Sequence, residues 1–240
     1  KIRWNIDIEN HTPYVIDHID FPNIVVKNDL TGTGGTGKLF WPAQGGCLIE
    51  DTRIRQDSKW VNYNPDFPQI GWGGYYPASA QMQYMAYYNK DGGLYFAAHD
   101  EKFHPKGIEF HKTSKEGIEL NFRLFTKSAK NDTYQLPYDM VLNVFEGNWY
   151  DASSIYRDWR DSSDIVLPPK IKENKSLPEW YFDSPIVVTY PIRGHTDLDK
   201  MSPNDDFFPY TNALKYINKY KNEFNSKIMA LLMHWEGTAP

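Results

Sequence analysis

The sequence predicts a mainly β protein, in which an antiparallel β-sandwich precedes a parallel strand–helix–strand unit. Up to residue 147, short segments with alternating apolar and polar residues follow one another, separated by clusters of Gly, Pro, Asn and Asp. Beyond that residue, apolar residues recur at helical spacing, and two further segments are continuously apolar. Continuously apolar strands are typical of parallel sheets, which are covered on both faces.

The alternating segments are expected to pair as antiparallel strands of the sandwich. In one of them Ile118, Leu120, Phe122 and Leu124 share one face, because successive side chains of a strand point to opposite sides. The sequence NKDGG at 89–93 predicts a hairpin between two neighbouring strands. The expected strands include NIVVKNDL (23–30), SAQMQYMAYYN (79–89), GLYFAAHD (93–100), IELNFRLFTK (118–127) and YDMVLNVFEG (138–147).

Three parts are expected along the chain: a β-sandwich domain at 1–147, a helical and irregular linker at 148–184, and the start of a second domain at 185–240. Two consecutive prolines at 168 and 169 end any regular element within the linker. The linker opens with a predicted helix, which has Asp151 and Ser153 near its start and the apolar stripe Ala152, Ile155, Tyr156 and Trp159.

The third part of the chain, 185–240, is predicted to form a single strand–helix–strand unit. One such unit can neither close a barrel nor cover both faces of its own sheet, so we expect the sequence to be a fragment of a longer protein. The three segments are the strand SPIVVTYPIRG (184–194), the helix PYTNALKYINKYKNEF (209–224) and the strand KIMALLMHWEG (227–237).

A glycine-rich stretch, TGTGGTGKLF at 31–40, has the spacing of a phosphate-binding P-loop without its final hydroxyl residue. A P-loop needs Ser or Thr after its lysine to hold magnesium, and a helix that opens at that point. Here Leu39 follows Lys38, and Pro42 comes soon after. We therefore interpret the stretch as a connection between two strands.

Composition argues against several function classes. A net charge of -5 and a pI of about 5.8 leave no positive surplus to neutralise phosphates, so no nucleic-acid or anionic-membrane partner is expected. The single cysteine, Cys47, excludes an internal disulfide framework and a cysteine-built zinc site. His99, His104 and His111 are spaced by five and seven residues, which argues against a histidine-built zinc site. No apolar run approaches the length of a membrane-spanning helix.

Four stretches carry a family resemblance: QMQYMAYYN (81–89), GGLYFAAHD (92–100), NWYDASSIYRDW (148–159) and LLMHWEG (231–237). In this order the chain resembles the N-terminal part of glycoside hydrolases in which a galactose-mutarotase-like supersandwich precedes a (β/α)8 barrel, as in the α-galactosidase and endo-α-N-acetylgalactosaminidase groups. The resemblance implies an antiparallel β-supersandwich followed by the first βαβ unit of a parallel barrel. With it we expect a carbohydrate substrate, no cofactor, and a secreted, periplasmic or cell-surface location.

In such enzymes two carboxylates flank the scissile bond, and the resemblance places them on later barrel strands, beyond Pro240. The residues present are expected to contact substrate instead, because barrel active sites collect at the C-terminal ends of the strands. The candidates are Arg193, His195 and Asp197 after the first barrel strand, His234, Trp235 and Glu236 after the second, and Trp72, His99 and Asp100 on the sandwich.

Other roles are open for some candidates. An indole face can pack on the C–H face of a sugar while a neighbouring carboxylate accepts hydrogen bonds from its hydroxyls, which suits Trp235 beside Glu236. Trp235 could equally pack at the barrel rim, and Glu236 could be a catalytic carboxylate. The loop at 71–81, which contains Trp72, could be a structural hairpin crossing.

Two functions from different classes follow. The first is a glycoside hydrolase whose sandwich supports and partly walls the barrel site. The second is a carbohydrate-binding or surface-scaffold protein without catalysis. Later barrel strands that end in two Asp or Glu residues would favour the enzyme, because fold alone does not fix function. The sequence predicts neither the sugar nor the oligomeric state.

Overall fold

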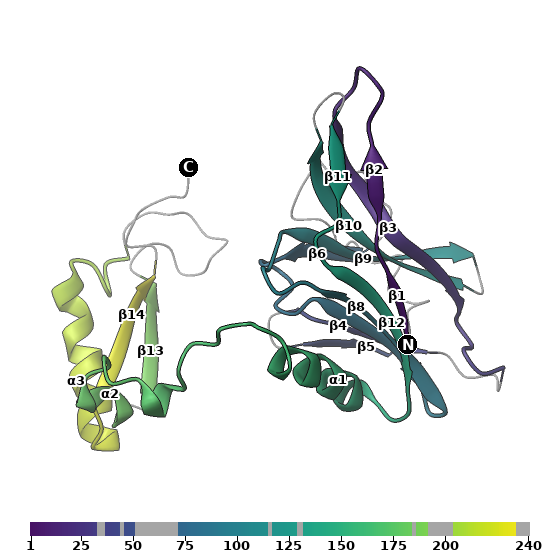
Figure 1. Cartoon of the computed structure of the whole chain (residues 1–240). Helices are drawn as coiled ribbons and strands as arrows, with labels where there is room; N and C mark the ends of the chain where they lie inside the picture. The colour runs from purple at the N-terminus through teal and green to yellow at the C-terminus, as the bar shows by residue number, and fades with distance from the viewer. Residues whose placement is uncertain are drawn as a thin grey trace. The chain divides into compact units, whose positions relative to one another are not determined.

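The computed structural model describes eight stretches of the 240-residue chain: residues 1–32, 37–43, 46–50, 72–114, 117–128, 132–183, 186–191 and 204–233. The chain divides into two compact units, Lys1–Val166 and Leu167–Pro240. Strands dominate the first unit, and helices with a short sheet form the second (Figure 1). The expectation of a mainly β protein with antiparallel sheets is confirmed.

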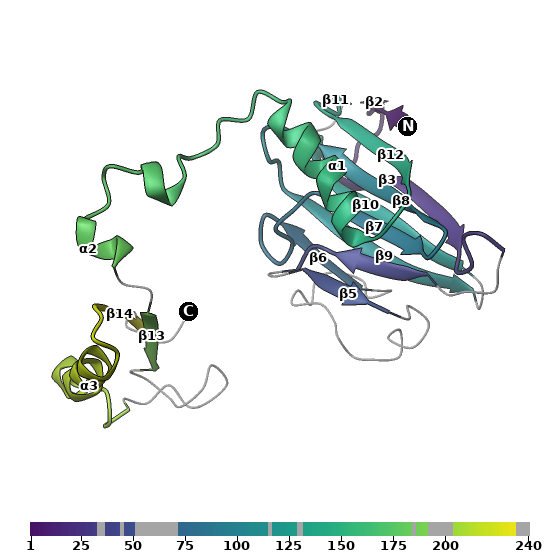
Figure 2. The same ribbon diagram turned by 90° about the horizontal axis from the view of Figure 1, so that it is seen from below.

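Two antiparallel sheets make up the sandwich of the first unit, and a short strand pair accompanies them (Figures 1 and 2). The six-stranded sheet has the order β1 (Ile2–Trp4), β12 (Asp139–Phe145), β8 (Gly92–His99), β7 (Tyr84–Asn89), β4 (Lys38–Trp41) and β5 (Cys47–Ile49). The four-stranded sheet has the order β3 (Ile16–Lys27), β10 (Gly117–Ser128), β9 (Lys106–Ser114) and β6 (Trp72–Tyr76). The short pair consists of β2 (Asp7–Glu9) and β11 (Thr133–Gln135).

The main core lies between the two large sheets. The alternation predicted for β10 is confirmed, because Ile118, Leu120, Phe122 and Leu124 are all buried in this core. Phe96 of β8 meets Phe122 edge to face, with ring centroids 4.9 Å apart. Burial of each such side chain contributes about 1.5–3 kcal/mol, so packing between the sheets stabilises the sandwich that carries the residues at the strand ends.

Two turn predictions are confirmed. The segment at 89–93 joins β7 to β8 as a hairpin in which Asn89 pairs with Gly92. Residues 33–36 of the glycine-rich stretch lie outside the described residues, but β3 ends before the stretch and β4 begins at Lys38, where a P-loop would need a helix. Glycine is required at position 37, because a Cβ there would collide with the ring of Tyr87.

Helix α1 (Trp149–Asp161) covers the outer face of the six-stranded sheet, as Figure 2 shows. Its N-cap is Asn148, whose side chain accepts a hydrogen bond at 2.9 Å from the backbone N–H two residues on, while Asp151 completes a capping box. The hydroxyls of Tyr84 and Ser153 lie 2.7 Å apart and tie the helix to β7. The helix predicted at the start of the linker is therefore present, and it packs on the sandwich.

The second unit contains a parallel pair of strands. β13 and β14 run in parallel with Ile186 opposite Ile228, and the helix α3 between them in sequence packs against β14. The predicted strand–helix–strand order is thus present, but its sheet has two strands among the described residues, and a barrel is not shown. The elements are η2 (Ile171–Glu173), α2 (Glu179–Phe182), β13 (Ile186–Pro191), η3 (Tyr210–Ala213), α3 (Leu214–Phe224) and β14 (Ile228–Met233).

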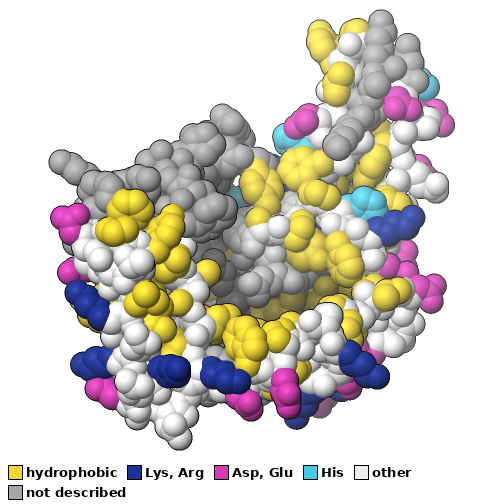
Figure 3. Space-filling view, turned by 90° about the vertical axis from the view of Figure 1, so that its left-hand side faces the viewer, with side chains coloured by type: hydrophobic (Ala, Val, Ile, Leu, Met, Phe, Trp, Pro, Cys, Tyr) yellow, Lys and Arg dark blue, Asp and Glu magenta, His cyan; other side chains and the backbone are white. Residues whose placement is uncertain are grey.

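Apolar side chains remain exposed on this small sheet. Val187 and Leu231 share one face of it and are 57% and 55% exposed. Figure 3 shows hydrophobic side chains, in yellow, between charged ones on one face of the molecule. Among the described helices none is long and apolar enough to cross a membrane.

Candidate functional site

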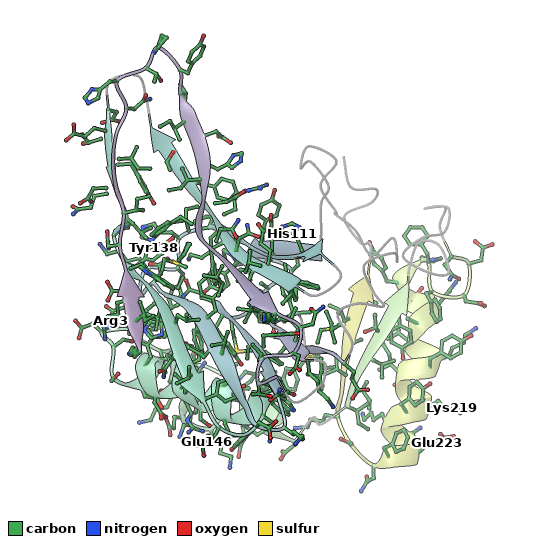
Figure 4. The ribbon with its side chains drawn as sticks, turned by 90° about the vertical axis from the view of Figure 1, so that its right-hand side faces the viewer. Arg3, His111, Tyr138, Glu146, Lys219 and Glu223 are labelled. Atoms are coloured by element: carbon green, nitrogen blue, oxygen red, sulfur yellow. The ribbon has the colours of Figure 1, made fainter. Side chains whose placement is uncertain are left out.

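A pocket of about 440 Å³ lies in the first unit, where β8 ends, β12 begins and α1 reaches its C-terminus. The ends of the two strands meet because His99 pairs with Asp139 in the antiparallel register. Figure 4 labels Arg3 and Tyr138 of its lining. The full lining consists of Arg3, His99, Asp100, Glu101, Lys102, Pro137, Tyr138, Asp139, Trp159, Ser162 and Ser163.

His99 forms the aromatic side of the pocket together with Trp159 of α1. The two rings stack with centroids 4.4 Å apart, and one ring nitrogen of His99 lies 3.1 Å from the hydroxyl of Tyr95. His99 is only 8% exposed, and burial, helped by the positive charges of Lys1 and Arg3, lowers its pKa to about 3. At neutral pH the imidazole is therefore uncharged and offers one donor and one acceptor nitrogen.

Asp100 follows His99 and organises the loop that forms the pocket wall. Its two carboxylate oxygens accept hydrogen bonds from the backbone N–H groups of Lys102 and His104, from the His104 ring and from Lys106. Burial alone would raise the pKa of this carboxyl, but the hydrogen bonds and charge of Lys106 and the hydrogen bonds from His104 and Lys102 outweigh it and lower the pKa. Asp100 is thus a charged side chain held by protein groups.

Lys106 lies behind this loop and has no exposed surface. Its ammonium donates to Asp100 at 2.8 Å and to the side-chain oxygen of Gln83 at 2.7 Å, and the rings of Tyr76 and Tyr138 lie 5.0 and 4.9 Å away. Burial lowers the pKa of Lys106 to about 8, against the opposing effect of Asp100. Paired and surrounded in this way, a buried charge becomes tolerable.

The rim of the pocket carries charges of both signs. Arg3 of β1 donates to Asp139 of β12 at 2.7 Å, and both side chains remain partly exposed. Glu101 and Lys102 line the pocket from the loop, and Ser162 lines it from the end of α1. The pocket therefore combines hydrogen-bond donors and acceptors with an aromatic side, which suits a polar ligand with hydroxyl groups.

The structure brings two of the predicted site residues, His99 and Asp100, to this pocket. Trp72 begins β6 in the four-stranded sheet, and its side chain lies outside the described part of the structure. Six further candidates, after the strands of the second unit, also lie outside the described residues: Arg193, His195, Asp197, His234, Trp235 and Glu236. Their roles stay predictions.

Two of the three histidines that are spaced by five and seven residues contact carboxylates. His104 contacts Asp100, and one ring nitrogen of His111 lies 3.3 Å from the Glu109 carboxylate. No group of three or more His, Cys, Asp or Glu residues in the described stretches has an arrangement that could hold a metal ion.

Several residues of the site were not predicted. Arg3 and Asp139 meet across 136 positions in sequence, which no local pattern reveals. Trp159 appeared only as a member of an apolar helical stripe. Lys106 could have been identified from the sequence. It shares the inward face of β9 with Ile108 and Phe110, and a lysine on a buried face needs a buried partner.

Residues 134–239 match the model of a domain of unknown function, DUF6259. The match covers less than half of the chain and includes β12, α1 and most of the second unit. Tyr138, Asp139 and Trp159 of the pocket lie inside it, while Arg3 and His99 lie outside. No curated protein matches the chain.

Proposed function

We propose that the pocket of the first unit binds a carbohydrate. The observation that carries this proposal is the lining itself, in which the stacked Trp159 and His99 rings face a rim of Arg3, Asp139 and Glu101. Sugar hydroxyls both donate and accept hydrogen bonds, and charged partners make these bonds stronger. The volume of about 440 Å³ falls within the range of about 300–1,000 Å³ that is usual for small-molecule sites.

Other ligand classes fit the lining less well. An apolar ligand would bury the charged rim without compensating it, which is costly. A phosphate would meet three carboxylates of the lining, those of Asp100, Glu101 and Asp139. Two cations, Arg3 and Lys102, line the same pocket, and the positive charge of Arg3 is already paired. A neutral, hydroxyl-rich ligand satisfies groups of both signs.

The experiment compares two exposed arginines that are both paired with an aspartate. Arg3 pairs with Asp139 in the pocket, and Arg157 pairs with Asp158 at 3.3 Å, outside the lining. Binding of methyl glycosides of galactose, glucose, mannose and N-acetylgalactosamine is measured by calorimetry. Arg3→Ala should weaken binding about tenfold to a hundredfold, since a hydrogen bond to a charged group contributes about 1.5–3 kcal/mol, while Arg157→Ala should not. Equal affinities of the two variants would rule out this pocket.

A catalytic role is the further part of the proposal. The resemblance to glycoside hydrolases supports it, and so does the parallel pair β13 and β14, whose exposed face at Val187 and Leu231 is of the kind that parallel sheets normally cover. On this proposal the chain is the N-terminal portion of a secreted, periplasmic or cell-surface hydrolase whose catalytic carboxylates follow Pro240. The alternative is a carbohydrate-binding protein without catalysis.

Hydrolysis of aryl α- and β-glycosides distinguishes the hydrolase from the carbohydrate-binding protein without catalysis. A longer protein that has this chain as its N-terminal portion should release the aryl group from at least one glycoside, and the 240-residue chain should release none. If the longer protein binds glycosides but hydrolyses none of them, the non-catalytic alternative holds.

A further inference from the structure

Lys106 stands out because it is fully buried, charged at neutral pH, and outside the pocket lining. Its contacts nevertheless reach the pocket by two routes. Through Asp100 it is joined to the loop at 100–105, and through its ammonium it faces the ring of Tyr138, which lines the pocket. A ligand has no access to Lys106, so any effect on binding must pass through these neighbours.

We propose that Lys106 is a positioning residue, whose ion pair with Asp100 holds the loop at 100–105 in its binding conformation and thereby sets the affinity of the pocket. This proposal rests on the pocket being the carbohydrate site. It adds a control element that lies behind the site and makes no ligand contact.

The loop depends on Asp100 for its shape. The Asp100 carboxylate holds the chain in a turn, because its two oxygens accept hydrogen bonds from the N–H groups of Lys102 and His104 at 3.0 and 2.6 Å. This turn leaves Glu101 and Lys102 exposed on its outer side, where they line the pocket. The loop does not hold this shape by local preference, because Phe103 adopts the left-handed region with a φ of +58°.

Asp100 in turn depends on Lys106. With the lysine removed, a carboxylate that is 1% exposed would keep its charge without its ionic partner. We expect Asp100 then to turn toward water, which would release the N–H groups of Lys102 and His104. The groups at the pocket wall then lose their fixed positions.

Charge on Lys106 gives the site a dependence on pH. The ionisable groups that face its ammonium are Asp100, Tyr76 and Tyr138, and the His104 ring contacts the same Asp100 carboxylate. The backbone carbonyl of His104 also accepts a hydrogen bond from the ammonium. Because the pKa of Lys106 is about 8 and that of Asp100 is lowered, a rise in pH through 8 discharges the lysine and leaves the carboxylate charged. The loop should loosen, and affinity should fall over this range.

The test compares Lys106→Met with Lys90→Met. Methionine keeps the length and packing of the lysine without its charge, and Lys90, in the hairpin at the other end of β8, is an exposed lysine paired with Asp91 at 3.2 Å. Two quantities are measured: the protection of the Lys102 and His104 amides against hydrogen exchange, and the affinity for the methyl glycoside that binds most tightly. In Lys106→Met both should fall about tenfold or more, and in Lys90→Met neither should change.

The outcomes distinguish a failure of the positioning role from a failure of the carbohydrate function. Unchanged amide protection in Lys106→Met, or lost protection with unchanged affinity, overturns the positioning role. If the wild-type chain binds no glycoside, the carbohydrate function is refuted, and amide protection alone then decides whether Lys106 holds the loop. If Lys106→Met does not fold, the wild-type chain decides: affinity must fall between about pH 7 and about pH 9.5, and a constant affinity overturns the proposal.

Discussion

His99 should make the first unit sensitive to acid. Burial lowers its pKa to about 3 in the folded state, whereas an unfolded histidine has a pKa of about 6.5. Between these values the unfolded chain binds a proton that the folded chain does not, so the free energy of unfolding falls as the pH falls. The difference of about 3.5 units corresponds to about 5 kcal/mol in total, of which about 3 kcal/mol is lost by about pH 4.

The assay compares chemical unfolding of the wild-type chain with that of His99→Phe, at about pH 7.5 and about pH 4. Phenylalanine keeps a ring against Trp159 but cannot be protonated, so this variant should lose about 3 kcal/mol less than the wild type on acidification. His11→Phe is the matched control, because the His11 side chain is 82% exposed. Unfolding is followed through the amides of β8, which report on the first unit. Parallel losses in the wild type and His99→Phe would refute the reasoning.

Two further predictions concern the same unit. Discharge of Lys106 weakens its local ion pair with Asp100, but it also removes the cost of a buried charge from the folded state as a whole. Between the folded pKa of Lys106, about 8, and its usual 10.5, the unfolded chain holds more protons, so the free energy of global unfolding should rise by about 3 kcal/mol with pH. Urea unfolding of the wild type and Lys106→Met checks this, and equal slopes would contradict it. Tyr84→Phe and Ser153→Ala each break the hydroxyl contact between β7 and α1, and each should cost about 1 kcal/mol. A double-mutant cycle should show coupling, and strictly additive losses would contradict the contact.

Much of the fold was predictable because it follows from local patterns. The alternation from Ile118 to Leu124 places apolar side chains on one face of β10 wherever that strand lies, and the glycines after Asn89 favour a tight turn. The continuous apolar strands similarly predicted the parallel pair β13 and β14. Each of these inferences needs only residues that are close in sequence.

The helix start shows where local reasoning falls short. Asp151 and Ser153 were expected near the start of α1, and both are there, but the cap itself is Asn148. Asn, Asp and Ser are similarly effective N-caps, so composition does not choose among them. Asp151 instead supplies the second half of the capping box.

The pocket was only half predictable. His99 and Asp100 were selected because they end a strand, and the structure places both at the pocket. Arg3, Tyr138 and Asp139 come from chain segments whose pairing depends on the register of β1 and β12. Register is set by the whole sheet and its turns, so no single segment of sequence reveals which side chains it brings together.

The carbohydrate assignment of the pocket is tested most directly by titrating the chain with the four methyl glycosides while recording the indole N–H signals of its tryptophans. Trp159→Phe identifies the Trp159 signal, and this signal should shift on binding together with the backbone amides of Glu101 and Lys102, which line the same pocket. Shifts confined to these groups are the predicted result. Saturable binding that leaves Trp159 unshifted, or no shift with any glycoside, would contradict the carbohydrate assignment of this pocket.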